Sequence, residues 1–160
     1  MNCSVIVSSS AILKKNLIDS ELLTEALFGE ELEVLKTSDN FSYVRLLNDN
    51  YYGWIDSNHI STLIYPSHRV LNSRTLVYNN ANIRAQYICY LSMGSLVEVT
   101  NIYNEWAEIK FFDNVQNISA YILKKDIVPK NDKKLDWVKY AEKLIYTPYK
   151  WGGKDTIGID

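Results

Sequence analysis

The side chains that could carry out nucleophilic chemistry in this sequence are its cysteines and histidines, Cys3, Cys89, His59 and His68. A thiolate beside an imidazole base is a common pair for acyl transfer. Here the spacing forms no cysteine–histidine motif. Cys89 lies in an apolar run, which predicts a small buried hydrophobic residue, and His59 is expected to be solvated at a domain edge. We therefore expect none of these residues to be catalytic.

A second group of chemically capable side chains stands in the stretch TPYKWGGKDTIGID, residues 147–160. It combines tyrosine and tryptophan, whose rings have an apolar body and a polar atom, with a glycine pair and an aspartate. This composition is not typical of the tail of a finished domain. We expect the pattern to lead into further sequence.

A helix is expected immediately before this stretch. Apolar residues at helical spacing share one face, and they are Trp137, Val138, Ala141, Leu144 and Ile145. Asn131 or Asp132 could cap the start of the helix. Pro148 should end it, because the residue before a proline avoids the helical region. The charged residues 130–134 are interpreted as a linker.

The preceding part of the chain contains an internal repeat. Residues 28–46 align without a gap on residues 93–111 at an offset of 65, and residues 53–60 align on 120–127 at an offset of 67. A repeat of this length is a small domain rather than a solenoid unit. Pro66 marks the joint between the copies, since proline cannot donate a hydrogen bond to a sheet.

Each copy is expected to be a small β-barrel, which makes the predicted fold class mainly β. Residues that alternate along the central strand should face the core, namely Ser42, Val44 and Leu46 in the first copy and Ala107, Ile109 and Phe111 in the second. Gly29 and Gly94 occupy equivalent positions just before a strand. A tight turn there needs a residue that tolerates positive φ.

Charge and composition exclude several classes of partner. The formal net charge is −2 and the sequence pI is near 5.7, so no basic face for nucleic acid is expected. No apolar run is long enough for a signal peptide core or a membrane span. The cysteines are too few for a disulfide framework. The sequence is thus expected to be that of a soluble cytoplasmic protein without a membrane partner.

The turn glycine, the aromatic residue before the central strand and the Gly-Trp-Ile sequence at residues 53–55 resemble bacterial SH3-like (SH3b) domains. The resemblance covers residues 5–64 and, more loosely, residues 68–129, where Ala-Tyr replaces Gly-Trp. In that family Gly-Trp is mostly scaffold. The resemblance therefore implies a place in the core or at a domain interface for four aromatic residues, which are Phe41, Trp54, Trp106 and Tyr121.

The stretch from Tyr149 to Asp160 resembles the NlpC-type peptidoglycan cysteine peptidases, in which Tyr-x-Trp-Gly-Gly is followed by Asp-Cys-Ser-Gly. Residues 130–160 would then be the linker, the first helix and the following loop of a papain-like α+β domain. The resemblance places the nucleophilic cysteine directly after Asp160 and the general-base histidine beyond it. No catalytic residue is therefore expected within this sequence.

Two SH3b copies ahead of an NlpC-type domain resemble the cytoplasmic γ-D-glutamyl-L-diamino-acid endopeptidases. These cleave short murein peptides such as L-Ala-γ-D-Glu-diaminopimelate, and they carry Ser-Glu-Leu-x-Thr and Tyr-x-Gly-Trp motifs, found here at residues 20–24 and 51–54. The resemblance implies that Glu21 and Tyr51 line the cleft. It also implies that Asp160 holds the free α-amine and that Tyr149 hydrogen-bonds near the reacting carbonyl. Murein peptides with a free N-terminus are the expected partners, with no cofactor and no metal.

Other interpretations of these residues stay open. Glu21 could be a solvated surface acid, Tyr51 a ring that packs on the barrel, and Tyr149 a packing residue. In the repeat Glu21 aligns with Gln86 and Tyr51 with Ile118, so the barrel demands neither. The alternatives to an endopeptidase are a non-catalytic SH3b module that binds murein or a partner, and a truncated remnant.

Overall fold

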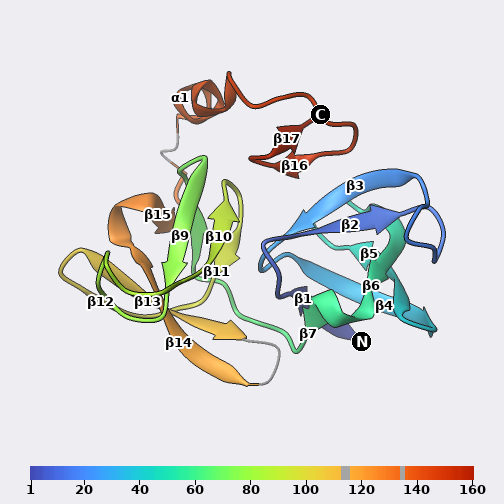
Figure 1. Cartoon of the computed structure of the whole chain (residues 1–160), viewed down its shortest axis with the longest axis horizontal. Helices are drawn as coiled ribbons and strands as arrows, with labels where there is room; N and C mark the ends of the chain where they lie inside the picture. Colours follow the sequence, from blue (N-terminus) through green and yellow to red (C-terminus); the bar gives the residue numbers. More distant parts are fainter. Residues whose placement is uncertain (113–115, 134–135) are drawn as a thin grey trace. The chain divides into compact units, whose positions relative to one another are not determined.

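The computed structural model describes residues 1–112, 116–133 and 136–160. The chain divides into two compact units, one formed by residues 1–64 with 147–160 and the other by residues 65–146 (Figure 1). Both are built mainly from antiparallel strands, which confirms the predicted fold class. Lys134, at the end of the predicted linker 130–134, lies outside the described residues.

Residues 1–64 form an antiparallel sheet that we call the first barrel. Its elements are β1 (Asn2–Val5), β2 (Ser9–Leu13), β3 (Leu22–Leu27), β4 (Glu31–Ser38), β5 (Phe41–Leu46), β6 (Tyr52–Asp56), the 3-10 turn η1 (Ser57–His59) and β7 (Ile60–Ser61). The strand order is β3-β2-β6-β5-β4-β1-β7. Strand β2 pairs with β3 and also, through Leu13 and Trp54, with β6.

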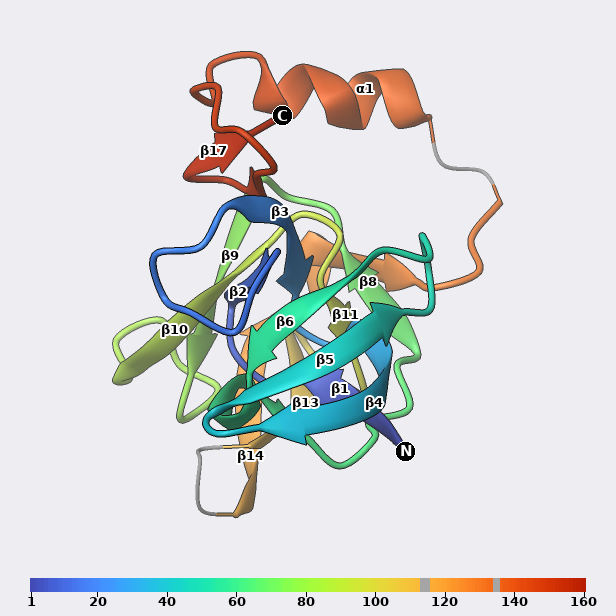
Figure 2. The same ribbon diagram turned by 90° about the vertical axis from the view of Figure 1, so that its right-hand side faces the viewer.

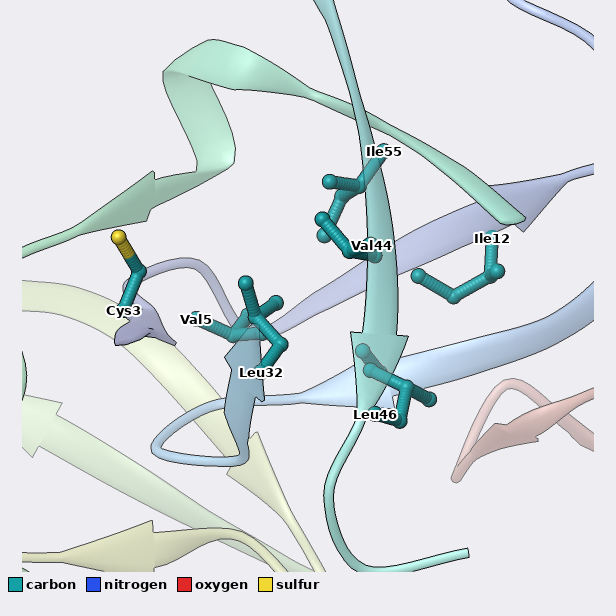
Figure 3. Packing of buried hydrophobic residues seen from close by; sticks show 8 residues of the cluster. Cys3, Val5, Ile12, Leu32, Val44, Leu46 and Ile55 are labelled. Atoms are coloured by element: carbon teal, nitrogen blue, oxygen red, sulfur yellow. The ribbon is translucent and has the colours of Figure 1, made fainter. Parts of the chain in front are cut away.

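The core of the first barrel follows from the alternation in β5. Val44 lies opposite Val34 and Leu46 lies opposite Leu32 in the register with β4, so these side chains share one face of the sheet. Val44 and Leu46 are fully buried, as predicted. The cluster to which they belong also contains Cys3, Val5, Ile12, Ala26, Leu32 and Ile55 (Figure 3). Each fully buried aliphatic side chain contributes about 1.5–3 kcal/mol, which makes this cluster a main source of stability.

The second unit repeats the same topology in a second barrel. Its elements are β8 (His68–Val70), β9 (Arg74–Tyr78), β10 (Tyr87–Ser92), β11 (Leu96–Val97), β12 (Val99–Tyr103), β13 (Trp106–Phe112), β14 (Asn117–Leu123), η2 (Lys124–Asp126) and β15 (Ile127–Pro129). The strand orders are β10-β9-β14-β13-β12 and β11-β8-β15. This is the order of the first barrel, with β4 represented by β11 and β12, which Glu98 separates. The structure thus confirms the internal repeat.

The repeated glycine has the same conformation in both barrels. Gly29 has a φ of 80° and Gly94 a φ of 92°, a region that residues with a side chain rarely adopt. Each amide donates to a carbonyl of the strand that opens its barrel, Gly29 to Val5 at 2.9 Å and Gly94 to Val70 at 3.0 Å. The positive φ expected at this turn is therefore confirmed.

One hydroxyl group in each barrel holds the side chain of the residue that ends the 3-10 turn. Ser10 Oγ lies 2.8 Å from His59 Nδ1, and Thr75 Oγ1 donates to Asp126 Oδ2 at 2.8 Å. Since Thr75 and Asp126 reproduce the contact without an imidazole, the Ser10–His59 pair is a packing feature and not a nucleophile with its base. His59 is half-buried rather than solvated, so that expectation was wrong.

The aromatic residues expected in a core or interface are half-buried and lie outside the buried clusters. Three of them contact tyrosines, with ring centroids 5.3 Å apart for Trp54–Tyr43, 5.6 Å for Trp106–Tyr78 and 6.4 Å for Tyr121–Tyr103. Trp54 and Tyr43 are also direct partners in the β5–β6 register. Such tilted and edge contacts stabilise an aromatic pair beyond its buried area.

The helix in the structure is shorter than the helix that the sequence pattern predicted. Helix α1 (Trp137–Ala141) continues as a 3-10 turn, η3 (Glu142–Leu144). Its N-cap is Asp136, whose carboxylate accepts a backbone N–H of the first turn, and not residues 131–132. Trp137, on the predicted apolar face, is 76% exposed. Among the described residues no helix is both long and apolar enough to cross a lipid bilayer.

Candidate functional site

Residues 147–160, which we call the C-terminal segment, form a compact loop within the same unit as the first barrel. Strands β16 (Lys154–Asp155) and β17 (Gly158–Ile159) pair antiparallel. The amide of Ile159 donates to the carbonyl of Pro148 at 3.0 Å. This bond returns the end of the segment to its beginning.

The loop brings together two of the predicted site residues, Tyr149 and Asp160. Asp160 Oδ2 accepts the N–H of Gly152 at 2.8 Å, and the phenol of Tyr149 lies near enough to the same carboxylate for the two groups to interact. Partial loss of water and the neighbouring negative charge raise the pKa of Tyr149 above its ordinary value of 10.0. The phenol is thus a hydrogen-bond donor at neutral pH. Both side chains are exposed, Tyr149 to 70%.

The glycine pair permits the close approach on which this loop depends. Gly152 has a φ of 65°, and a Cβ on it would lie 3.1 Å from the carbonyl oxygen of Leu23 in β3. A Cβ on Gly153 would overlap the carbonyl group of Gly158 in the opposite strand. A larger residue at position 152 would force the loop away from β3, and one at position 153 would disrupt the pairing of β16 with β17.

The C-terminal segment contacts strand β3 of the first barrel through β16, and Figures 1 and 2 show the loop that carries β17 next to this strand. Trp151 Nε1 donates to the carbonyl oxygen of Leu22 at 3.1 Å. Lys150 forms an ion pair with Glu25, and Lys154 forms one with Glu30 at 2.9 Å. The sequence interpretation missed these contacts. The available signal was that neither acid recurs in the second copy.

Glu21 immediately precedes β3. Its carboxylate lies 2.7 Å from Lys14 Nζ, and its side chain is 52% exposed. It lines a hollow of about 480 Å³ together with Lys14, Lys15 and residues 17–20. The carbonyl of the next residue, Leu22, is the acceptor of the Trp151 indole. Glu21 therefore adjoins a residue that the C-terminal segment contacts.

Tyr51 stands in the turn before β6 and is 49% exposed. Its amide donates to Asp49 Oδ1 at 3.2 Å, and Asp49 Oδ2 lies 3.5 Å from Lys154 Nζ. The C-terminal segment thus contacts the turn that carries Tyr51. In the described part of the chain, no hydrogen bond or ion pair joins Glu21 or Tyr51 directly to Tyr149 or Asp160.

Cys3 provides no activated thiol. Cys3 is buried in the first core, and burial raises the pKa of its thiol, which disfavours the nucleophilic thiolate. Cys89, predicted to be buried, is half-buried in β10. Over the described ranges, no group of three or more histidine, cysteine, aspartate or glutamate side chains is placed to hold a metal ion.

Part of this chain matches a known protein family. Residues 12–60 match the family described as the bacterial dipeptidyl-peptidase Sh3 domain. This match covers β3, β5 and β6, and with them Glu21, Glu25 and Tyr51. No match is found among curated proteins.

The fold of the whole chain is similar to that of an NlpC/P60 family protein from Bacillus cereus ATCC 10987. The TM-score is 0.80 at 15% sequence identity, and the likeness covers 100% of this chain and 68% of that chain. NlpC2 and NlpC1 from Trichomonas vaginalis match with TM-scores of 0.34 at 14% and 13% identity. Each covers 81% of this chain, against 48% and 45% of those chains. The Bacillus cereus likeness shows a common fold, to which the Trichomonas matches add nothing.

Proposed function

We propose that the chain is the N-terminal portion of a murein-peptide cysteine endopeptidase. The substrate would be a free peptide such as L-Ala-γ-D-Glu-diaminopimelate, cleaved at the γ-D-Glu–L-diamino acid bond. One observation carries the proposal: the loop that holds Tyr149 beside Asp160 contacts both the strand next to Glu21 and the turn of Tyr51. The likenesses to a dipeptidyl-peptidase Sh3 domain and to an NlpC/P60 fold support it.

The chemistry of these groups suits a peptide with an uncapped amino end. An ammonium that leaves water needs carboxylate partners, and Asp160 offers one at the surface that the N–H of Gly152 already orients. The first barrel would close one end of the cleft and thereby exclude crosslinked peptidoglycan. Such a cleft fits recycling of murein fragments in the cytoplasm better than lysis of the wall.

The nucleophile of the proposed reaction would be a cysteine directly after Asp160 in a longer polypeptide. Cys3 does not suit this role, because it is buried and its thiol pKa is raised. The 160-residue chain by itself should therefore not hydrolyse the peptide. Its part in the reaction would be to bind and orient the substrate.

The direct test measures release of diaminopimelate from L-Ala-γ-D-Glu-diaminopimelate by the longer polypeptide, with the N-acetylated peptide as the matched substrate. We expect the free peptide to be cleaved and the capped one to resist, because acetylation removes the ammonium. The Asp160→Asn variant should lose most of this preference. Equal cleavage of both peptides by the unaltered protein would contradict the proposed amine site.

A second candidate function is a non-catalytic SH3b module that binds murein or a partner. The exposed neighbouring rings of Tyr51 and Tyr52 favour it, since aromatic side chains with a polar end are frequent in binding surfaces. This alternative predicts that the 160-residue chain sediments with purified insoluble peptidoglycan. If it stays in solution at micromolar concentration, binding to murein is ruled out.

A further inference from the structure

Glu25 is an acidic residue buried on an edge strand. Strand β3 lies at the end of the strand order of its sheet, yet residues 24–27 are all buried. Ala26 belongs to the core cluster, and since successive side chains of a strand point to opposite faces, Glu25 lies on the other face. There it is 5% exposed. A carboxylate with so little contact with water requires polar partners.

All the partners that the structure gives to this carboxylate come from the C-terminal segment. Glu25 Oε1 accepts from the ammonium of Lys150. Glu25 Oε2 accepts the backbone N–H of Lys154 at 2.8 Å and that of Asp155 at 3.2 Å. A second contact of β16 with the first barrel supports this attachment, since Ser9 Oγ donates to Asp155 Oδ2 at 2.7 Å.

The second barrel serves as an internal control for this position. At the offset of 65 residues, Glu25 aligns with Tyr90 of β10. The residues of β10 from Ile88 to Tyr90 are only half-buried, so this strand is not covered as β3 is. The barrel itself therefore does not require an acid here. The carboxylate is explained by the groups of the C-terminal segment that it binds.

The residues between the attachment points hold Asp160. Gly152 donates its N–H to Asp160 Oδ2 at 2.8 Å, and the carbonyl of Gly153 accepts the N–H of Asp160 at 3.0 Å. Both glycines lie between Lys150 and Lys154, which Glu25 binds. Fixing the ends of this short stretch limits the positions open to Asp160.

We propose that Glu25 is a positioning residue that fixes Asp160 through Lys150 and the amides of β16. The effect on substrate amine binding rests on the proposed function, whereas the effect on the loop does not. A charge-free Glu25→Gln side chain would keep the shape but lose the ion pair with Lys150. The loop should then detach more often while the first barrel stays folded.

Amide hydrogen exchange measured by NMR on the 160-residue chain tests the positioning. Glu25→Gln and Lys150→Met should each speed exchange at Gly152 and Asp160 by about tenfold or more, because the hydrogen bonds of these amides depend on the short stretch whose two ends Glu25 fixes. Lys150→Arg keeps the positive charge, so its amides should be as well protected as those of the unaltered chain. The matched control Glu33→Gln removes a carboxylate from the first barrel that binds Arg45 instead, at 3.1 Å, and should leave both amides unchanged.

Exchange within about twofold of the unaltered chain in both Glu25→Gln and Lys150→Met would overturn the proposal. Equal acceleration in Glu33→Gln, or equal acceleration at the buried core residue Val44, would also overturn it. Either result would mean that the carboxylate supports global stability and not the loop. If Glu25→Gln does not fold, Lys150→Met decides, because it leaves β3 intact.

Kinetics of the longer polypeptide test the effect on the amine. Glu25→Gln should raise KM for the free peptide about tenfold and thereby reduce the preference for it over the N-acetylated peptide, whereas Lys150→Arg should keep the preference of the unaltered polypeptide. An unchanged preference in a Glu25→Gln variant with a loosened loop would overturn the amine part of the proposal. If the unaltered polypeptide cleaves neither peptide, the proposed function fails, and the exchange experiment still decides on the positioning.

Discussion

Replacement of Gly152 by alanine should detach the C-terminal segment without unfolding the first barrel. Gly152 has a φ of 65°, where a residue with a Cβ is less favourable by roughly 1–2 kcal/mol. The added Cβ would also lie 3.1 Å from the carbonyl oxygen and 3.2 Å from the carbonyl carbon of Leu23, backbone atoms held in β3. Overpacking of this kind costs about 1–3 kcal/mol. The strain in the attached state is therefore about 2–5 kcal/mol.

This strain disappears when the loop leaves β3, so it acts on the local opening equilibrium. Because about 1.4 kcal/mol corresponds to a tenfold change, the detached population should rise by roughly 30-fold to several thousand-fold. The amides of Lys154 and Asp155, which donate to Glu25 Oε2 in β3 at 2.8 and 3.2 Å, report this opening. Their hydrogen exchange should accelerate by the same factor, up to the limit of free exchange.

The amide of the core residue Val44 is the internal reference, since detachment of the loop should not expose it. Gly152→Asn is the matched variant, because asparagine tolerates positive φ better than alanine while its Cβ makes the same contacts. It should recover part of the protection. Unchanged exchange at Lys154 in Gly152→Ala, or acceleration at Val44 by the same factor, would refute the reasoning.

Three further outcomes are expected. Leu46→Ala should lower the free energy of unfolding by about 2–5 kcal/mol in urea titrations, because it opens a cavity in the first core; a loss below about 1 kcal/mol would contradict that core. Burial raises the pKa of Glu30 above its ordinary 4.5, and Lys154 only partly offsets this, so its contribution to stability is complete below that value and is lost as pH rises through the raised pKa. The stability of the unaltered chain relative to Glu30→Gln should thus be higher at pH 4 than at pH 7, and a flat difference would speak against it. Asp160→Asn should lower the pKa of Tyr149 toward 10.0 in a ring-carbon NMR titration, since it removes a negative charge beside the phenol, and an unchanged titration would show that the two side chains do not interact.

The barrels could be predicted from the sequence because their signals are local. Alternation along β5 and β13 identified buried residues such as Val44 and Ile109, and the turn glycine Gly29 recurred in register. These patterns reflect the two-residue period of a strand and the steric limits on φ, which any stretch of chain obeys by itself. Neither requires knowledge of what lies across the fold.

The predictions that failed depend on distant contacts. The helix pattern indicated an earlier start, yet Asp136 provides the cap, because several polar residues in a row could serve and only the backbone geometry selects one. His59 looked like a solvated edge residue, but Ser10 in a strand far away in sequence binds its ring.

The candidate site divides in the same way. Tyr149 and Asp160 stand close in the sequence, and the motif that contains them was enough to single out both. The Glu25–Lys150 pair joins residues 125 positions apart. A charged pair at such a separation leaves no periodic pattern in the sequence. Nothing in the first copy by itself distinguishes Glu25 from the other acidic residues near Glu21.

The two barrels together separate what the fold needs from what the site needs. Positions that keep their character in both copies, such as Val44 and Ile109, are fully buried and define the barrel. Glu25 breaks this correspondence, with Tyr90 in its place. A buried carboxylate is unfavourable unless hydrogen-bonded cationic and backbone donors surround it, so selection for the barrel alone would not retain it. Glu25 lies on β3, the strand that the loop carrying Asp160 contacts. The acid at this position therefore serves the attachment of the loop and not the fold of the barrel.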